Sequence, residues 1–199
     1  MTKPMSRRER NLAEIRDRAT PLAEAIVFNE GIEAMSARRL ARELGISVGS
    51  LYNAFGDLEA VKRAVIGNSA QALSDHLAAT LARAEPNPRS RVVALGEAYL
   101  DFAISEPQRW WLLFEYRNTV SPDRKVEEFQ IGLLDMLVRA GGGDPASESS
   151  KQFFLLLWAS VHGLVSLACR PTIVAIEPDL ARSHIRDMVH SGFNTAGLP

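Results

Sequence analysis

Four histidines and one cysteine are the side chains in this sequence that could bind a metal ion or supply a reactive thiolate. His76, His162, His184 and His190 lack the spacing of a zinc site, such as two histidines four residues apart with a supporting carboxylate. Cys169 is predicted to be a small buried hydrophobe. The sequence also has no nucleophile elbow, phosphate-binding loop or pair of carboxylates that would share a cleft. We therefore expect no metal, no cofactor and no enzymatic activity.

Composition limits the classes of partner. The chain has 199 residues, 46% of them hydrophobic, which is enough to bury a core. Its formal net charge is -1, so it cannot coat nucleic acid or an anionic membrane by bulk charge. Residues 1–63 nevertheless hold 11 Lys or Arg against 9 Asp or Glu, whereas the remainder holds 12 against 15. Any binding of nucleic acid is therefore expected to be local to the amino-terminal part.

The sequence favours a cytoplasmic location. A single cysteine suits a reducing compartment, and the basic, polar start MTKPMSRRERN does not resemble a signal peptide. The longest apolar run, residues 153–169, is shorter than the roughly 20 residues that a bilayer requires and contains Ser160, His162 and Ser166. We interpret it as a buried helix, with a membrane span as the alternative.

The hydrophobic pattern predicts an all-α chain of about nine helices. Leu, Ala, Glu and Arg dominate, and no segment shows the alternating pattern of a strand. Pro21 is a difficulty for the first helix, because it removes a backbone hydrogen bond and is associated with kinks or breaks. Taken from the capping and stop signals, the predicted helices are 8–30, 36–45, 47–55, 57–84, 89–105, 107–117, 122–140, 146–170 and 178–194.

Two of these helices are short and are joined by a tight turn. Leu40 and Leu44 lie four residues apart in the first, and Leu51 and Phe55 lie four apart in the second, with Gly45 between the two helices. These are the dimensions of a helix-turn-helix, in which the second helix enters the major groove of DNA. That second helix, within GISVGSLYNAFGD, carries no Lys or Arg.

Residues 30–61, EGIEAMSARRLARELGISVGSLYNAFGDLEAV, resemble the helix-turn-helix of the tetracycline-repressor (TetR) family of transcription regulators. The resemblance implies a DNA-binding domain at residues 1–56 and a helical ligand-binding and dimerisation domain at residues 57–199. It also implies a homodimer in which the last two helices form the interface, a two-fold arrangement that suits a palindromic operator. The alternative is that these two helices only complete the core of one protomer.

Two stretches of the carboxy-terminal half resemble one subgroup of that family. LLLWASVHGLVSLA, residues 155–168, is similar to its Trp-His-Gly motif, and EPQRWWLLFEYR, residues 106–117, fits the same pattern.

The DNA-binding segment departs from the family at two positions. Val48 and Leu58 stand where the family commonly has lysine, so two usual phosphate contacts are missing. Arg38, Arg39 and Tyr52 are expected to compensate, and Arg7, Arg8 and Arg10 provide a further basic arm. The alternatives are that Tyr52 packs in the protein and that Arg38 and Arg39 are ordinary solvated charges.

An uncharged helix can still read bases through hydrogen bonds, methyl contacts and shape. Val48 would then meet a thymine methyl, Gly49 would permit close approach, and Ser50 and Asn53 would bond to bases or a phosphate. The predicted DNA-contacting residues are Arg38, Arg39, Ser47, Val48, Gly49, Ser50, Tyr52 and Asn53.

Aromatic residues concentrate beyond residue 98, where they suit either a helical core or a pocket for a small apolar or aromatic effector. His162 lies four residues after Trp158 and is either a core histidine bonded to a carbonyl or carboxylate, or a ligand contact. The predicted ligand-binding residues are Trp110, Phe114, Phe154, Trp158 and His162.

These features predict a ligand-responsive repressor that binds a palindromic operator as a homodimer. The alternative is a TetR-like small-molecule binding protein with weak or no DNA binding, which Val48 and Leu58 favour.

Overall fold

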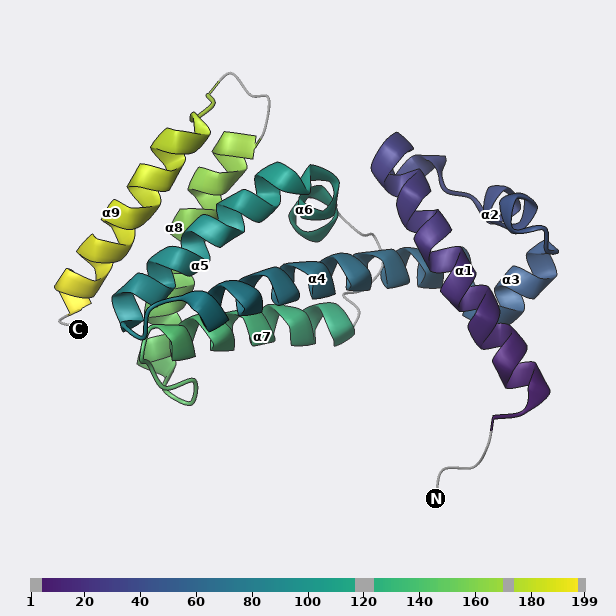
Figure 1. The fold of residues 1–199 in the computed structure, drawn as a ribbon, viewed down its shortest axis with the longest axis horizontal. Coiled ribbons are helices and arrows are strands. Elements are labelled where there is room, and N and C mark those ends of the chain that lie inside the picture. The colour runs from purple at the N-terminus through teal and green to yellow at the C-terminus, as the bar shows by residue number, and fades with distance from the viewer. Residues whose placement is uncertain (1–4, 117–123, 170–173, 197–199) are drawn as a thin grey trace. The chain divides into compact units, whose positions relative to one another are not determined.

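The computed structural model describes residues 5–116, 124–169 and 174–196, with the side chains of 124–127 left out (Figure 1). The described residues form α-helices with one short 3₁₀ turn and no strand, which confirms the predicted all-α class of about nine helices. The helices are α1 (Arg7–Glu30), α2 (Ala37–Leu44), α3 (Val48–Phe55), α4 (Leu58–Arg83), α5 (Pro88–Ser105), α6 (Pro107–Phe114), α7 (Arg124–Ala140), α8 (Glu148–Cys169) and α9 (Pro178–Ala196), with the 3₁₀ turn at Ile32–Ala34.

Local capping chemistry explains where four of these helices begin. Ser6 and Glu9 form a capping box at the start of α1, and Ser36, Ser47 and Asn87 each accept a backbone hydrogen bond at the starts of α2, α3 and α5. The predicted helix ends at Arg117, Pro122 and Arg170 lie outside the described residues.

Pro21 does not divide α1, which runs as one helix through it. Losing one backbone hydrogen bond and meeting the ring's clash costs about 3 kcal/mol in a helix interior. The side of α1 that carries Ala19, Ala23, Ile26 and Val27 is buried, and this packing offsets that cost.

The chain divides into two compact units, residues 1–69 and 70–199. The division falls inside α4, which therefore begins in the amino-terminal unit and ends in the carboxy-terminal unit. The sequence placed the domain boundary earlier, after residue 56.

The amino-terminal unit consists of α1, α2, α3 and the first part of α4. Leu40, Leu51, Val61 and Val65 are fully buried, so that each of α2, α3 and α4 contributes to its core.

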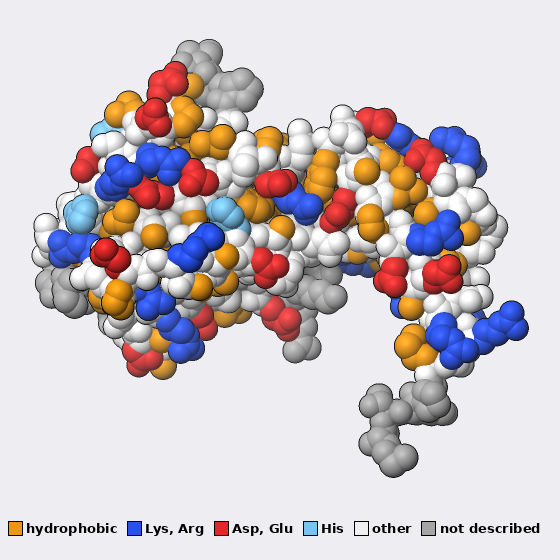
Figure 2. Space-filling view, viewed as in Figure 1, with side chains coloured by type: hydrophobic (Ala, Val, Ile, Leu, Met, Phe, Trp, Pro, Cys, Tyr) orange, Lys and Arg blue, Asp and Glu red, His pale blue; other side chains and the backbone are white. Residues whose placement is uncertain are grey.

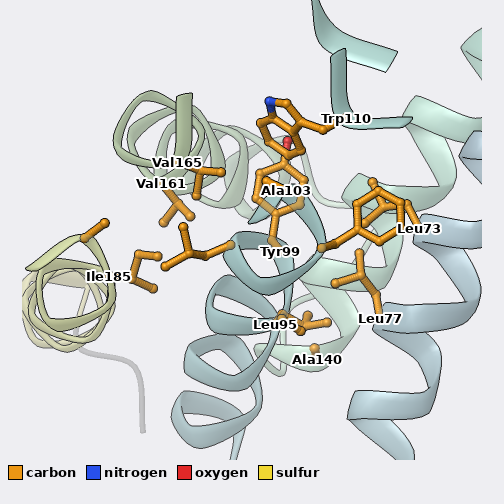
Figure 3. Packing of buried hydrophobic residues seen from close by; sticks show 14 residues of the cluster. Leu73, Leu77, Leu95, Tyr99, Ala103, Trp110, Ala140, Val161, Val165 and Ile185 are labelled. Atoms are coloured by element: carbon orange, nitrogen blue, oxygen red, sulfur yellow. The ribbon is translucent and has the colours of Figure 1, made fainter. Parts of the chain in front are cut away.

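The carboxy-terminal unit packs α5, α8 and α9 side by side, with α7 against α5 and α8 (Figure 1). One buried cluster includes Leu73, Leu100, Val165 and Ile185 (Figure 3). A second cluster surrounds Phe154 and Phe193.

Candidate nucleic-acid interface and ligand cavity

The turn between α2 and α3 depends on glycine and serine. Gly45 adopts φ 70° and ψ 31°, the left-handed conformation that favours glycine, and its N–H bonds back to the last turn of α2. The hydroxyl of Ser47 accepts a hydrogen bond from the Ser50 N–H at 3.0 Å and starts α3. The bonds made by Gly45 and Ser47 therefore fix the angle between α2 and α3, two eight-residue helices joined by a turn of three residues.

Two arginines of α1 hold the carboxyl ends of α2 and α3. The Arg16 Nε donates to the Ala54 carbonyl at 2.6 Å, and an Arg18 Nη donates to the Leu44 carbonyl at 3.0 Å. Both carbonyls lie in the last turns of their helices, where no intrahelical partner is available. These contacts use two basic side chains to fix the positions of α2 and α3 against α1 rather than to bind an external anion.

The opposite side of α3 faces solvent. Leu51 and Ala54 are buried, whereas Gly49, Asn53 and Tyr52 are exposed, Tyr52 by 43%. Gly49 and Asn53 are four residues apart and therefore lie on the same side of the helix. These three are the exposed members of the predicted DNA contacts within α3.

The other three predicted contacts on this segment are less free. Val48 and Ser50 are half-buried, and the Ser50 hydroxyl lies 2.9 Å from that of exposed Ser47. One of the two hydroxyls therefore donates to the other, which limits how each can bond to a base.

The two predicted cations on α2 differ sharply. Arg38 is exposed, whereas Arg39 bonds to both oxygens of Glu30 at 2.6 and 2.7 Å and to Glu43 at 2.8 Å. The hydrogen bonds to Glu30 and then Glu43 raise the pKa of Arg39, and the same Arg39 bonds lower the pKa of Glu30. The charge of Arg39 is thus matched by two carboxylates of its own unit.

The carboxy-terminal unit contains a cavity of about 350 Å³. Helices α4, α5, α6, α7, α8 and α9 all contribute to its wall. Within the described part of the wall, Tyr99, Gln130 and Trp158 are the side chains with polar atoms, and none is acidic or basic. Such a wall suits an uncharged, largely apolar molecule with one or two hydrogen-bonding groups.

The predicted ligand residues fall into different positions around this cavity. Phe114 and Trp158 line it. Trp110 and Phe154 are 3% and 1% exposed and belong to the two separate buried clusters, and neither lines the cavity. His162 is half-buried and does not line it either.

His162 belongs to an aromatic cluster next to the cavity wall. Its ring stacks on Trp110 at 5.4 Å and on Trp158 at 5.1 Å between centroids, and its Nδ1 lies 2.9 Å from the Tyr99 hydroxyl. Figure 3 shows Tyr99 and Trp110 beside each other within the buried packing. The core interpretation of His162 expected a carbonyl or carboxylate partner, and the partner is instead a phenol.

Burial sets the ionisation of this cluster. It raises the pKa of Tyr99 well above its usual value, although a hydrogen bond from the Trp158 indole acts in the opposite direction. Burial also lowers the pKa of His162, so the imidazole is neutral at pH 7. Because Tyr99 accepts from the indole, its hydroxyl proton is available to donate to the neutral His162 Nδ1.

Most of the cavity wall could not be identified from residue types. Tyr99 is one of several aromatic residues beyond position 98, and Leu133, Leu137 and Val161 show no signal beyond apolar helical spacing. That spacing identifies which side of a helix is buried but not where the buried sides leave a space.

Helix α8 combines a buried side with an exposed apolar side. Val161 and Val165 pack in the core, whereas Leu155 and Leu156 are exposed by 45% and 62%. Among the described residues, α8 is the helix whose length and composition would allow it to cross a membrane, and 22% of that window is buried. One such helix is weak evidence for a membrane span, because core helices of soluble proteins pass the same test.

Comparison with known proteins places this geometry in a family. Residues 92–189 match the family described as "Tetracyclin repressor-like, C-terminal domain". This segment contains the cavity residues of α5 to α9 and both stretches that resemble the Trp-His-Gly subgroup. No curated protein matched the chain.

Solved structures share the fold over nearly the whole chain. A protein of unknown function from Rhodococcus sp. RHA1 is 24% identical, with a TM-score of 0.76 over 89% of this chain and 94% of its own. A TetR-family transcriptional regulator from Streptomyces coelicolor is 18% identical, with a TM-score of 0.67 over 92% and 98%. A candidate transcriptional regulator from Saccharomonospora viridis, solved in complex with choline, is 18% identical, with a TM-score of 0.62 over 89% and 96%.

The helix-turn-helix of α2 and α3, the matched carboxy-terminal domain and the shared fold lead to one conclusion. The chain belongs to the TetR family of transcription regulators.

Proposed function

We propose that this chain is a homodimeric repressor that reads a palindromic operator through α3 and releases it when a small molecule fills the carboxy-terminal cavity. The observation that carries the proposal is the solvent-facing side of α3, where Gly49, Tyr52 and Asn53 stand exposed on a helix whose carboxyl end bonds to Arg16 of α1. A rigid helix that presents donors, acceptors and a bare backbone suits entry into a major groove.

On this proposal, α3 supplies base contacts and its neighbours supply phosphate contacts. Asn53 can pair with adenine, and Val48 can meet a thymine methyl. The exposed Arg38 and the hydroxyl of exposed Tyr52 would bond to backbone phosphates. Arg39 contributes to DNA binding only where a phosphate competes with Glu30 and Glu43 for its guanidinium.

Dimerisation uses the exposed apolar sides of α8 and α9. Leu155 and Leu156 on α8 and Leu180 on α9 are each exposed by 45% or more, and exposing large apolar side chains to water costs free energy. An interface there would bury them, and its two-fold symmetry would set two copies of α3 about 34 to 36 Å apart for a palindromic site. This dimer is proposed to act in the cytoplasm.

The effector is proposed to be a small apolar or aromatic molecule without net charge. Its size is limited by the cavity of about 350 Å³, and its polar groups would meet Gln130, Tyr99 or Trp158. The S. viridis protein binds choline, a cation. Three aromatic rings, Tyr99, Phe114 and Trp158, would attract such a cation here, but the described wall offers it no carboxylate.

Helix α4 is proposed to carry the response. It starts in the unit that holds α3, and its Leu77 lines the cavity. A ligand that fits the cavity better in one orientation of α4 would shift the dimer toward that orientation by its difference in affinity for the two states.

Selection of random duplex DNA on the purified protein, at about physiological salt where nonspecific binding is weak, tests the proposal. We expect a palindrome to be enriched and its enrichment to be lost in the double variant Ser50→Ala, Asn53→Ala. The double variant Ser74→Ala, Asn68→Ala, which changes the same residue types on α4, is the matched control and should recover the same palindrome.

The second candidate is a TetR-like ligand-binding protein with weak or no DNA binding. It is favoured by the pairing of Arg39 with Glu30 and Glu43, together with Val48 and Leu58 in place of the common lysines. Selection that enriches no sequence, from protein that still binds apolar molecules, would support this second function.

A further inference from the structure

The amino-terminal turns of α1 and one side of α3 line an open surface hollow of about 480 Å³, which we call the α1–α3 hollow. It lies within the amino-terminal unit and is separate from the ligand cavity. Its polar lining consists of Arg7, Arg8 and Asn11 from α1 and Ser50 and Asn53 from α3.

The charge of this lining is positive. Arg7 and Arg8 are exposed, and neither has an ion-pair partner among the described residues. Figure 2 shows basic side chains gathered at this end of α1. Arg10 lies one turn after Arg7 but does not line the hollow. Its guanidinium instead donates to the Met5 carbonyl at 2.7 Å.

The donors of the hollow converge because of helical spacing. Arg7 and Arg8 precede Asn11 by four and three residues, which places the three side chains on one side of α1. Guanidinium groups bind phosphate oxygens with paired N–H bonds, and amide and hydroxyl donors complete such a site. A phosphodiester therefore fits the lining better than an uncharged molecule would.

Asn53 belongs both to the hollow and to the exposed side of α3. A DNA strand whose bases meet α3 would thus bring its backbone to the hollow. This continuity distinguishes the α1–α3 hollow from an isolated basic patch.

We infer that the α1–α3 hollow holds a backbone phosphate of the duplex that α3 reads, with Arg7 and Arg8 supplying the positive charge that α3 lacks. The inference rests on the proposed DNA-reading function and adds positioning residues outside the helix-turn-helix. It explains how a helix without Lys or Arg keeps a strong electrostatic contribution close to its bases.

The test measures how duplex affinity depends on salt. Fluorescence anisotropy with the selected palindrome is followed from about 50 to 300 mM NaCl for the wild-type protein and the double variant Arg7→Ala, Arg8→Ala. Each phosphate that is neutralised contributes about 0.9 to the slope of log K against log salt, so losing one phosphate in each protomer should lower the slope of the double variant by about 1.8 for the dimer.

Two matched comparisons distinguish a phosphate bound in the hollow from a general effect of positive charge on DNA binding. Arg10→Ala removes the same charge from the same helix end outside the hollow, and its slope should stay at the wild-type value. Asn11→Asp places a carboxylate in the hollow and should weaken binding at low salt by about tenfold relative to Asn11→Ala, because the carboxylate would repel a phosphate. Circular dichroism verifies that all variants keep the wild-type helix content.

Failure of this inference differs from failure of the proposed function. Suppose that the wild-type protein selects a palindrome. An unchanged salt slope in the Arg7→Ala, Arg8→Ala variant, or an equal loss of slope in Arg10→Ala, would then overturn the phosphate site in the α1–α3 hollow alone. A wild-type protein that selects no palindrome from random duplexes overturns both.

Discussion

The guanidinium of Arg39 donates to both carboxylate oxygens of Glu30, from Nη1 at 2.7 Å and from Nη2 at 2.6 Å. This bidentate pair joins the last turn of α1 to the first turn of α2. A third bond, to Glu43 on α2, fixes the guanidinium further. The pair therefore ties the first helix of the helix-turn-helix to α1, and it makes Arg39 a structural cation before it can be a DNA contact.

The Glu30–Arg39 pair should make stability depend on pH in the acidic range. The Arg39 hydrogen bonds lower the pKa of Glu30 below 4.5, so the folded state holds the Glu30 proton less tightly than the unfolded chain. This contribution is fully present above pH 4.5 and is lost as the pH falls through the lowered pKa of the folded state.

Thermal unfolding of the wild type and of Glu30→Gln, followed by circular dichroism, measures the effect. We expect the variant to have the lower Tm near neutral pH and the difference to shrink toward about pH 3. Glu33→Gln, on the short turn that follows α1, is the matched control. A Tm difference that is the same at every pH would assign Glu30 no role as an ion-pair partner.

Gly49 offers a test of close approach to DNA that leaves the protein itself unchanged. A Cβ at Gly49 would have Ser47 Oγ, at 3.7 Å, as its nearest contact, which is ordinary packing. Gly49→Ala should therefore fold normally, whereas the added methyl would stand between α3 and the floor of a groove. We expect operator affinity to fall by about tenfold, equivalent to about 1.4 kcal/mol.

Gly67→Ala is the control for this substitution. Gly67 also lies in a helix of the amino-terminal unit, and a Cβ there would meet nothing within 4 Å. It should bind the operator as the wild type does in anisotropy titrations. Wild-type affinity in Gly49→Ala would show that the backbone of α3 does not approach the bases at this position.

Capping signals made the helix-turn-helix predictable, because they act locally. Ser36, Ser47 and Gly45 set the ends of α2 and α3 through bonds to residues a few positions away, and these bonds are visible in the sequence itself. The pairing of Arg39 with Glu30 joins residues nine apart across a turn, so residue types alone left Arg39 open as either a DNA contact or a solvated charge.

The ligand cavity was less predictable, because it is a space left between helices. Phe154 and Trp158 lie four residues apart on α8, yet Phe154 is in a closed core and Trp158 lines the cavity. Helical periodicity gives both residues the same side of the helix. Which one faces a void depends on how α5 and α7 pack against α8, and that is set by contacts far apart in the sequence.

His162 should produce a second pH dependence, separate from that of Glu30. Burial lowers its pKa below the ordinary 6.5, so the unfolded chain takes up this proton more readily than the folded protein. The neutral histidine stabilises the fold fully above pH 6.5, and this contribution is lost as the pH falls below 6.5.

We expect the Tm of the wild type to fall between about pH 7.5 and 5.5 more than that of His162→Gln, which does not titrate but can still accept from the Tyr99 hydroxyl. His184→Gln is the control, because His184 is exposed on α9. Parallel pH profiles for the wild type and His162→Gln would show that protonation of His162 does not oppose folding.

Ile131 lines the ligand cavity while remaining 62% exposed, so it can be enlarged without disturbing the core. Ile131→Trp should obstruct the cavity and weaken binding of the neutral fluorescent probe N-phenyl-1-naphthylamine by about tenfold or more, equivalent to about 1.4 kcal/mol. Ile104→Trp, 44% exposed on α5 and outside the cavity wall, is the matched control. Equal probe binding in both variants would place the apolar binding site elsewhere.

The proposed dimer interface can be tested at positions that a single protomer does not need. Leu156 on α8 is 62% exposed, and a Cβ at Gly163 on the same helix would meet nothing within 4 Å. Leu156→Glu would place a charge in a buried apolar interface, and Gly163→Leu would separate helices that must approach closely there.

Light scattering coupled to size-exclusion chromatography should therefore find a dimer for the wild type and monomers for Leu156→Glu and Gly163→Leu, with helix content unchanged. Ile104→Glu adds the same charge to an exposed apolar residue on α5 and should remain dimeric. Operator affinity should fall in the two monomeric variants, because one protomer reaches only half of a palindrome. If both variants remain dimeric, the interface does not lie on α8. The proposed spacing of the two α3 helices would then be wrong as well.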